Sequence, residues 1–279
     1  MVQALNPPAI DSVALIDEVV AERQNGVNKD FFNGMAAEWR QRVQEYVDNQ
    51  GSPVTLGRWA AVDPRKNTLI NLFKSPAKGS AQGNALAQLR VHHLTFCPAC
   101  GEVGRPNTLD HFLPKGAYPQ FAIVPHNLFP MCDACQGAKL EKTGDADDPK
   151  FFIHPYYDRF SVPKLVSLTI SPPFATPAFE VRANPALLEN EQKLVSRHLL
   201  ELEINTRFID YFREQYRRIL RLAGEIRKSE GDLPATFGYF RFAANSISTN
   251  SWDCIVYDAV LSNDDLIQYL SAGELPPLL

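Results

Sequence analysis

The stretch of residues 97–139 decides the fold, and it reads CPACGEVGRPNTLDHFLPKGAYPQFAIVPHNLFPMCDACQGAK. It contains two pairs of cysteines, each with a spacing of two residues between its members: Cys97 with Cys100, and Cys132 with Cys135. Four thiolates in this arrangement are typical of a tetrahedral zinc site. A zinc ion that closes a loop of about thirty residues stabilises a structure whose core is too small to fold alone. We therefore expect a structural Zn²⁺ and a metal-stabilised module.

Polar residues suited to hydrolytic chemistry lie between the two cysteine pairs. Asp110 and His111 are adjacent, and Asn127 comes shortly before the second pair. Hydrolysis of a phosphodiester needs an activated water and a cation that neutralises the developing charge. A histidine can take the proton from the water, and oxygen or imidazole ligands hold a hard divalent ion. A zinc-stabilised loop would present these side chains in fixed positions, as a site requires.

With these residues, the segment resembles the HNH endonucleases of the ββα-metal class, in the variety whose core is stapled by a four-cysteine zinc. The order of the family pattern is CxxC, Asp-His, Asn-Leu, CxxC and Lys, and residues 97–139 follow it. The resemblance implies that His111 is the general base and that Asp110 binds a catalytic Mg²⁺ or Mn²⁺. It also implies that the amide of Asn127 orients the loop that carries the histidine.

One position departs from the family pattern. The residue directly after the fourth cysteine is usually His or Asn and binds the catalytic metal, whereas this chain has Gln136. A glutamine still offers a carbonyl oxygen, which suits Mg²⁺, but its side chain is one methylene longer. Gln136 is therefore either a working ligand of the catalytic ion or the mark of a weakened site. A zinc ribbon without catalysis is a further alternative for the four cysteines.

The formal net charge of −4 is unevenly distributed. Residues 58–90 carry six basic residues against one acidic residue, and residues 205–228 carry seven against three. A phosphate backbone would be attracted to such basic zones, although a solvated basic helix face has the same composition. The residues expected to contact nucleic acid are Lys115, Lys139, Arg213, Arg217 and Arg221.

The fold class expected is α+β and mainly helical, with a zinc-stapled ββα-metal core inserted between N-terminal and C-terminal helical regions. Three domains follow: residues 1–90 as an N-terminal helical region, residues 91–160 as the nuclease core, and residues 161–279 as a short β-hairpin followed by helices. Apolar residues at three- and four-residue steps predict helices, and alternation predicts strands. The helices are expected at 10–24, 29–49, 186–228, 236–247 and 251–272, a hairpin at 164–171 and 178–182, and the core hairpin at 107–128 with a helix beginning near Cys132.

The expected function is metal-dependent hydrolysis of DNA by an HNH endonuclease, which the resemblance implies leaves a 5′-phosphate and a 3′-hydroxyl. Proteins of this family often serve in bacterial defence against phage, in some cases beside an ATPase. An ATPase or other protein partner, and a homo-oligomer, are therefore candidate associations. Two other functions stay open: a catalytically impaired, zinc-dependent nucleic-acid-binding module, and a scaffold for protein interactions.

The composition also carries expectations about location. No apolar run reaches the eighteen or so residues that would span a membrane, and the first residues lack the pattern of a signal peptide. Four of the five cysteines are assigned to zinc rather than to disulfides, which favours a reducing compartment. The cytoplasm is the expected location, with no membrane partner.

Overall fold

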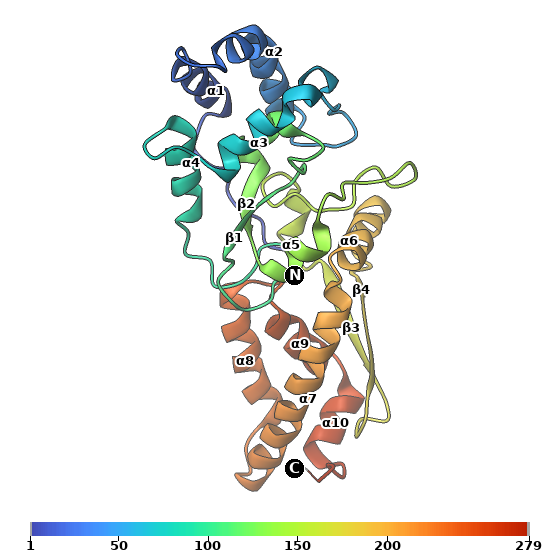
Figure 1. Ribbon diagram of the computed structural model, residues 1–279. Helices are drawn as coiled ribbons and strands as arrows, with labels where there is room; N and C mark the ends of the chain where they lie inside the picture. The colour runs from blue at the N-terminus through green and yellow to red at the C-terminus, as the bar shows by residue number, and fades with distance from the viewer. Residues whose placement is uncertain (1, 278–279) are drawn as a thin grey trace. The chain divides into compact units, whose positions relative to one another are not determined.

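The computed structural model describes residues 2–277 and has an α+β fold that is mainly helical, with two small sheets (Figure 1). This agrees with the predicted fold class at the level of secondary structure. The chain forms two compact units, which are described separately. Unit 1 consists of Met1–Gln3, Phe96–Gly104 and Phe160–Leu279, and unit 2 consists of Ala4–Thr95 and Arg105–Arg159.

Unit 2 begins with helices that pack around buried aromatic side chains. Helix α1 contacts α2 and α4, and α3 contacts α4. Trp39 and Tyr46 of α2 are fully buried, and the Trp39 indole N–H donates to the Gln120 carbonyl oxygen at 2.7 Å. Asp11 caps α1 by accepting hydrogen bonds from the first turn, a position at which aspartate is favoured. The helices of this region are α1 (Ser12–Ala21), α2 (Lys29–Asp48), α3 (Lys66–Lys74) and α4 (Ala81–Arg90), with a 3₁₀ helix at Ala60–Arg65.

A ββα arrangement follows the N-terminal helices within unit 2. Strand β1 (Thr108–His111) pairs antiparallel with β2 (Leu128–Met131), so that His111 lies opposite Leu128. Helix α5 (Asp133–Lys139) begins directly after β2 and contacts β1. Helix α4 packs against both strands, mainly through Leu86. Short 3₁₀ helices in and after this region span Pro119–Phe121, Pro125–Asn127 and Arg159–Ser161.

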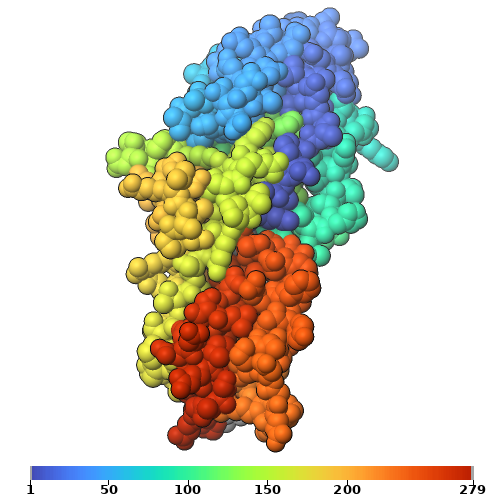
Figure 2. Space-filling model, turned by 180° about the vertical axis from the view of Figure 1, so that it is seen from behind, coloured from blue at the N-terminus to red at the C-terminus, as the bar shows by residue number. Residues whose placement is uncertain are grey.

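Unit 1 contains a β-hairpin and a set of helices. Strands β3 (Val166–Ser171) and β4 (Ala178–Ala183) pair antiparallel, close to the predicted positions. Helix α9 packs against β3, and α8, α9 and α10 lie side by side (Figures 1 and 2). Asp232, Ser251 and Asn263 cap α8, α9 and α10, respectively. The helices are α6 (Glu189–Glu201), α7 (Ile204–Lys228), α8 (Leu233–Ile247), α9 (Trp252–Leu261) and α10 (Asp264–Ala272).

Two helices that the sequence predicts as continuous are interrupted. The predicted helix at 186–228 is wrong as a single element, because Glu203 adopts a left-handed backbone (φ 52°) and separates α6 from α7. The predicted helix at 251–272 divides at Asn263, whose side chain accepts from the Leu266 N–H and starts a new helix. A cap inside an apolar pattern redirects the chain without changing the three- and four-residue spacing of buried positions. Among the described residues, no helix is both long and apolar enough to cross a membrane.

Candidate functional site

The four cysteines of the two CxxC pairs converge. Their sulfur atoms all lie within 4.8 Å of one another, and Cys97, Cys100 and Cys135 are buried while Cys132 is half-buried. Sulfur atoms around a tetrahedral Zn²⁺ with bonds of about 2.3 Å are separated by about 3.8 Å. The four-thiol donor set therefore fits a structural zinc, and the sequence prediction of a zinc-stabilised module is supported at this level. Cys254 lies in α9 outside this group, and burial raises the pKa of its thiol.

Local backbone geometry explains how the first cysteine pair forms a ligand-bearing turn. The Cys97 N–H donates to the Glu102 carbonyl at 3.0 Å, and the Gly101 N–H donates back to the Cys97 carbonyl at 2.7 Å. Gly101 has φ 78°, a conformation that favours glycine. The second pair uses a helix start, because Cys132 directly precedes α5 and its carbonyl accepts from the Gln136 N–H at 3.0 Å.

The histidine expected to act as the general base ends strand β1 and is almost fully buried, with 2% of its surface exposed. Its Nε2 lies 2.9 Å from the Ala122 carbonyl oxygen. A carbonyl can only accept a hydrogen bond, so Nε2 carries the proton and Nδ1 of neutral His111 keeps its lone pair. The Phe73 ring packs against the imidazole with centroids 4.4 Å apart. Burial, with a smaller effect of the Lys115 ammonium, lowers the pKa of His111 to about 3.

The amide of Asn127 holds the loop that follows β1. Its Oδ1 accepts from the Leu113 N–H at 2.7 Å, and its Nδ2 donates to the carbonyl oxygens of Leu113 at 3.0 Å and Phe121 at 3.1 Å. The residue is fully buried, so these bonds do not compete with water. The contacts are those of a residue that fixes the backbone of the loop that follows His111.

Two residues that the sequence did not single out for this role extend the Asn127 network. The Tyr156 N–H donates to His154 Nδ1 at 3.2 Å, which leaves the proton on Nε2 of the neutral ring. His154 Nε2 then donates to the Tyr46 hydroxyl at 3.2 Å, and that hydroxyl donates to Asn127 Oδ1 at 3.0 Å. Burial lowers the pKa of His154 well below its usual value, which keeps the ring neutral. His154 therefore packs in the core.

Asp110, Gln136 and Lys139 form a second polar cluster beside the histidine. The Gln136 side-chain amide donates to Asp110 Oδ1 at 3.2 Å. The Lys139 ammonium donates to the His111 carbonyl at 2.6 Å and forms an ion pair with Asp110 Oδ2 at 3.3 Å. The contact between Lys139 and Asp110 is an ion pair only, because Asp110 Oδ2 accepts no hydrogen bond. Burial lowers the pKa of Lys139, and Asp110 opposes this effect.

The expectation that Lys139 contacts a phosphate backbone is corrected by its position. Only 1% of the residue is exposed, and its ammonium is directed at Asp110 and the backbone of β1. A cation in this environment stabilises the cluster rather than meeting a polyanion in solvent. Lys139 is the last residue of α5, and nothing in the sequence indicated that its side chain would be buried.

The oxygen donors of this cluster fit a hard divalent ion only with additional ligands from outside the chain. Asp110 supplies a carboxylate, and a half-turn of the Gln136 amide would direct its carbonyl oxygen toward the same position. Mg²⁺ is commonly held by one or two protein oxygens together with water and substrate phosphate. Apart from the four cysteines, no cluster of three or more His, Cys, Asp or Glu side chains converges among residues 2–277. The Lys139 ammonium beside Asp110 opposes a second cation.

The other basic residues expected to contact nucleic acid have different surroundings. Lys115 follows the loop after β1, is half-buried, and places Nζ 5.5 Å from the centre of the Phe73 ring. On the exposed face of α7, Arg213 pairs with Asp210 at 3.3 Å and Arg217 pairs with Glu214 at 2.6 Å. Arg221 is exposed on the same helix. The alternation of acids and bases on α7 weakens the case for a dedicated polyanion-binding stripe.

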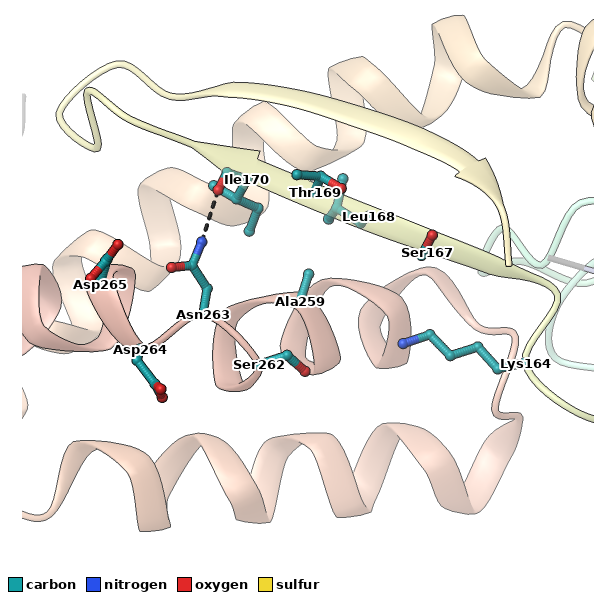
Figure 3. Close-up of a pocket in the computed structure, with 10 residues that line it drawn as sticks. All are labelled: Lys164, Ser167, Leu168, Thr169, Ile170, Ala259, Ser262, Asn263, Asp264 and Asp265. Carbon is teal, nitrogen blue, oxygen red and sulfur yellow. Dashed lines mark hydrogen bonds between the residues drawn. The ribbon is translucent and has the colours of Figure 1, made fainter. Parts of the chain in front are cut away.

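A groove in unit 1 is lined by none of the predicted site residues. It has a volume of about 530 Å³ and runs along β3 and the junction of α9 with α10 (Figure 3). The Lys164 side chain lies at one end, and Asp264 and Asp265 lie at the other. The Asn263 side chain donates to the Ile170 carbonyl oxygen at 2.8 Å across this groove.

Comparison with known proteins gives one partial relationship. Protein ea31 of Escherichia phage lambda is 40% identical over 131 residues, which is 43% of this chain and 44% of the phage protein. The match therefore covers less than half of either protein, and the name of the relative states no activity. No protein-family model matches the chain, and no solved structure matches it.

Proposed function

We propose that the protein is a metal-dependent endonuclease of the HNH type that hydrolyses DNA phosphodiester bonds. The observation that carries the proposal is the orientation of His111 at the end of β1. The Ala122 carbonyl fixes the proton on Nε2, so that Nδ1 is the basic nitrogen of a ring adjacent to Asp110 in sequence. The ββα order, the zinc-binding cysteines and the Asn127 clamp provide the rigid surroundings that such a base needs.

The chain's own residues divide the chemistry among them. His111 accepts a proton from the attacking water at Nδ1. Its lowered pKa keeps the ring neutral near neutral pH, and it also makes the ring a weaker base than an ordinary histidine. Asn127 holds the loop in place. Asp110 and Gln136 would hold Mg²⁺ or Mn²⁺, which when bound neutralises charge on the phosphate and leaving oxygen. Lys115, half-buried and near the His111 ring, is the basic residue best placed to meet a phosphate.

The proposal is tested by incubating the purified chain with supercoiled plasmid in Mg²⁺ or Mn²⁺. We expect metal-dependent nicking that EDTA abolishes and that His111→Ala reduces by at least about 100-fold, the usual contribution of a general base. His93→Ala is the matched control, because His93 is exposed and precedes the zinc-binding segment. Equal activity of the two variants, or cleavage in EDTA, would overturn the assignment of His111.

The second candidate function is a nucleic-acid-binding module with impaired catalysis. The Lys139–Asp110 ion pair favours this alternative, because an ammonium already neutralises the carboxylate that would bind the catalytic ion. This module would bind DNA with an affinity that falls as salt rises, and it would not cut. A protein-interaction scaffold would show neither property, so a salt titration of DNA binding separates it from the other two.

Gln136 provides an independent test of the catalytic ion. If its carbonyl is a ligand, Gln136→Asn should retain cleavage and shift the Mg²⁺ concentration that gives half-maximal activity. The same half-maximal concentration in both proteins would count against a ligand role for this position. Defence against phage, cytoplasmic location and association with an ATPase or with a second copy of the chain belong to this proposal through the family resemblance alone.

A further inference from the structure

The turn that carries the first cysteine pair is held by other segments of unit 1. Three consecutive backbone carbonyls accept hydrogen bonds from outside the turn. The Gln3 N–H donates to Pro98, and His198 Nε2 lies 2.7 Å from the Ala99 carbonyl oxygen. The Trp252 indole donates to the Cys100 carbonyl at 2.6 Å. His198 and Trp252 are buried, so the turn is fixed by side chains that lie 99 and 152 residues away in the sequence.

A pair of opposite charges lies next to the sulfur of Cys100. An Arg207 guanidinium nitrogen is 3.7 Å from Cys100 Sγ, and a Glu102 carboxylate oxygen is 3.9 Å from the same sulfur. Arg207 also forms an ion pair with Glu102. The guanidinium is further held by a hydrogen bond to the Leu202 carbonyl at 3.3 Å and lies 6.0 Å from the centre of the Trp252 ring. Its position is therefore set by several contacts and does not depend on the sulfur.

The two charges have opposite effects on a thiolate. Zn²⁺ bound by four thiolates carries a formal charge of −2, so a nearby cation stabilises the bound state and a nearby anion destabilises it. We propose that Arg207 is a charge-compensating residue of the zinc site, which donates to the Cys100 thiolate and offsets the repulsion from Glu102. The inference concerns zinc retention and does not depend on nuclease activity.

The chemistry of the side chain explains why an arginine serves here. The planar guanidinium has several N–H donors in a fixed fork, so it can contact a sulfur, a carboxylate and a backbone carbonyl at the same time. A lysine would carry the same charge on a single flexible atom. Charged outer partners of metal ligands typically change metal affinity by about 10- to 100-fold when they are removed.

The test measures Zn²⁺ affinity by competition with a chromophoric chelator, using the full chain. We expect Arg207→Gln to lower the affinity by about 10-fold or more and Glu102→Gln to raise it. The double variant should lie between the two single variants. Lys164→Gln is the matched control, because the ion pair that it breaks, with Asp258 at 3.1 Å, is partly exposed and includes none of the four clustered cysteines.

The opposite changes in zinc affinity expected for Arg207→Gln and Glu102→Gln distinguish an electrostatic role from a structural one. If both single variants lower zinc affinity, or if neither differs from Lys164→Gln, the proposal is wrong. The Glu102 side chain is 41% exposed, so Glu102→Gln should fold even if Arg207→Gln does not. A higher zinc affinity of Glu102→Gln would then be enough to show that charge next to the sulfur controls zinc binding. Co²⁺ substitution provides a second readout, since loss of the cation beside the Cys100 thiolate should shift the thiolate-to-Co²⁺ charge-transfer band to lower energy in Arg207→Gln.

Discussion

Replacement of Asn127 by aspartate tests the clamp on the loop next to His111 with almost no change of shape. The aspartate retains an oxygen for the Leu113 N–H and the Tyr46 hydroxyl, which bond to Oδ1 at 2.7 Å and 3.0 Å. It loses both N–H donors, which bond to the carbonyls of Leu113 and Phe121 at 3.0 Å and 3.1 Å. The change therefore isolates the donor half of the amide.

The expected loss of stability follows from the two lost donors. The Leu113 carbonyl oxygen is left without a hydrogen bond, whereas the Phe121 carbonyl oxygen still accepts from the Val124 N–H at 3.2 Å. A buried group without a partner costs about 1–3 kcal/mol, so the loss is about 1–3 kcal/mol. The new carboxyl oxygen would also face those two carbonyl oxygens, which favours its protonated form over the charge. The free energy of unfolding of a domain is about 5–15 kcal/mol, so Asn127→Asp should lower the stability of unit 2 by an amount that is readily measured.

The assay is urea unfolding at pH 7 followed by circular dichroism, with the midpoint and slope fitted for each transition. Asn67→Asp on α3 is the matched control, because that residue is exposed, and it should change the free energy of unfolding by less than about 0.5 kcal/mol. A loss below about 1 kcal/mol for Asn127→Asp would refute the reasoning, because it would mean that the amide donors are not required to hold the loop.

Three further predictions concern groups around the site. Tyr46→Phe should lower the free energy of unfolding by about 1–3 kcal/mol, because it leaves His154 Nε2–H without its acceptor in the core; an unchanged urea midpoint would contradict this network. Burial lowers the pKa of His198 from 6.5 to about 4. The contribution of neutral His198 to the free energy of unfolding is therefore fully present above pH 6.5 and is lost as the pH falls toward 4. The loss amounts to about 2 kcal/mol between pH 7 and pH 5, and His198→Gln should flatten that part of a stability–pH curve; an equally steep curve would assign the acid sensitivity to other groups. Removal of zinc by a strong chelator should expose four thiols to a thiol reagent and lower the thermal midpoint, and added Zn²⁺ should restore both; four thiols that react at the same rate before and after chelation would exclude a four-cysteine zinc.

The parts of the site that the sequence predicted are the parts encoded by short spacing. The two CxxC pairs, the Asp110–His111 dipeptide and the start of α5 after Cys132 lie within one continuous stretch, and the structure brings the four sulfurs together. The cap-forming residues of the helices are equally local, as the hydrogen bonds from the first turn of α1 to Asp11 show. Local patterns predict such features because the groups involved are within a few residues of one another.

The supporting contacts could not be read in the same way, because they join residues far apart in the sequence. Tyr46 reaches Asn127 across 81 residues, and Arg207 reaches Cys100 across 107 residues. Tyr46 occupies an ordinary apolar position of α2, and nothing in its neighbours distinguishes its hydroxyl from that of another core tyrosine. Glu203, whose left-handed backbone ends one helix and starts the next, likewise has no glycine or proline beside it to mark the break.

The burial of Lys139 has the largest consequence for function. A cation with 1% of its surface exposed requires a compensating charge, and Asp110 provides it at 3.3 Å. The same carboxylate is the ligand that we propose for a catalytic divalent ion, so the lysine and such an ion would draw on one negative charge. An ion that binds here must gain enough from water and the substrate phosphate to offset the nearby ammonium. Tight binding of the ion is therefore expected only when the phosphate is present, and a weak affinity for Mg²⁺ in the free protein would be a property of the Lys139–Asp110 pair rather than a sign of a lost activity.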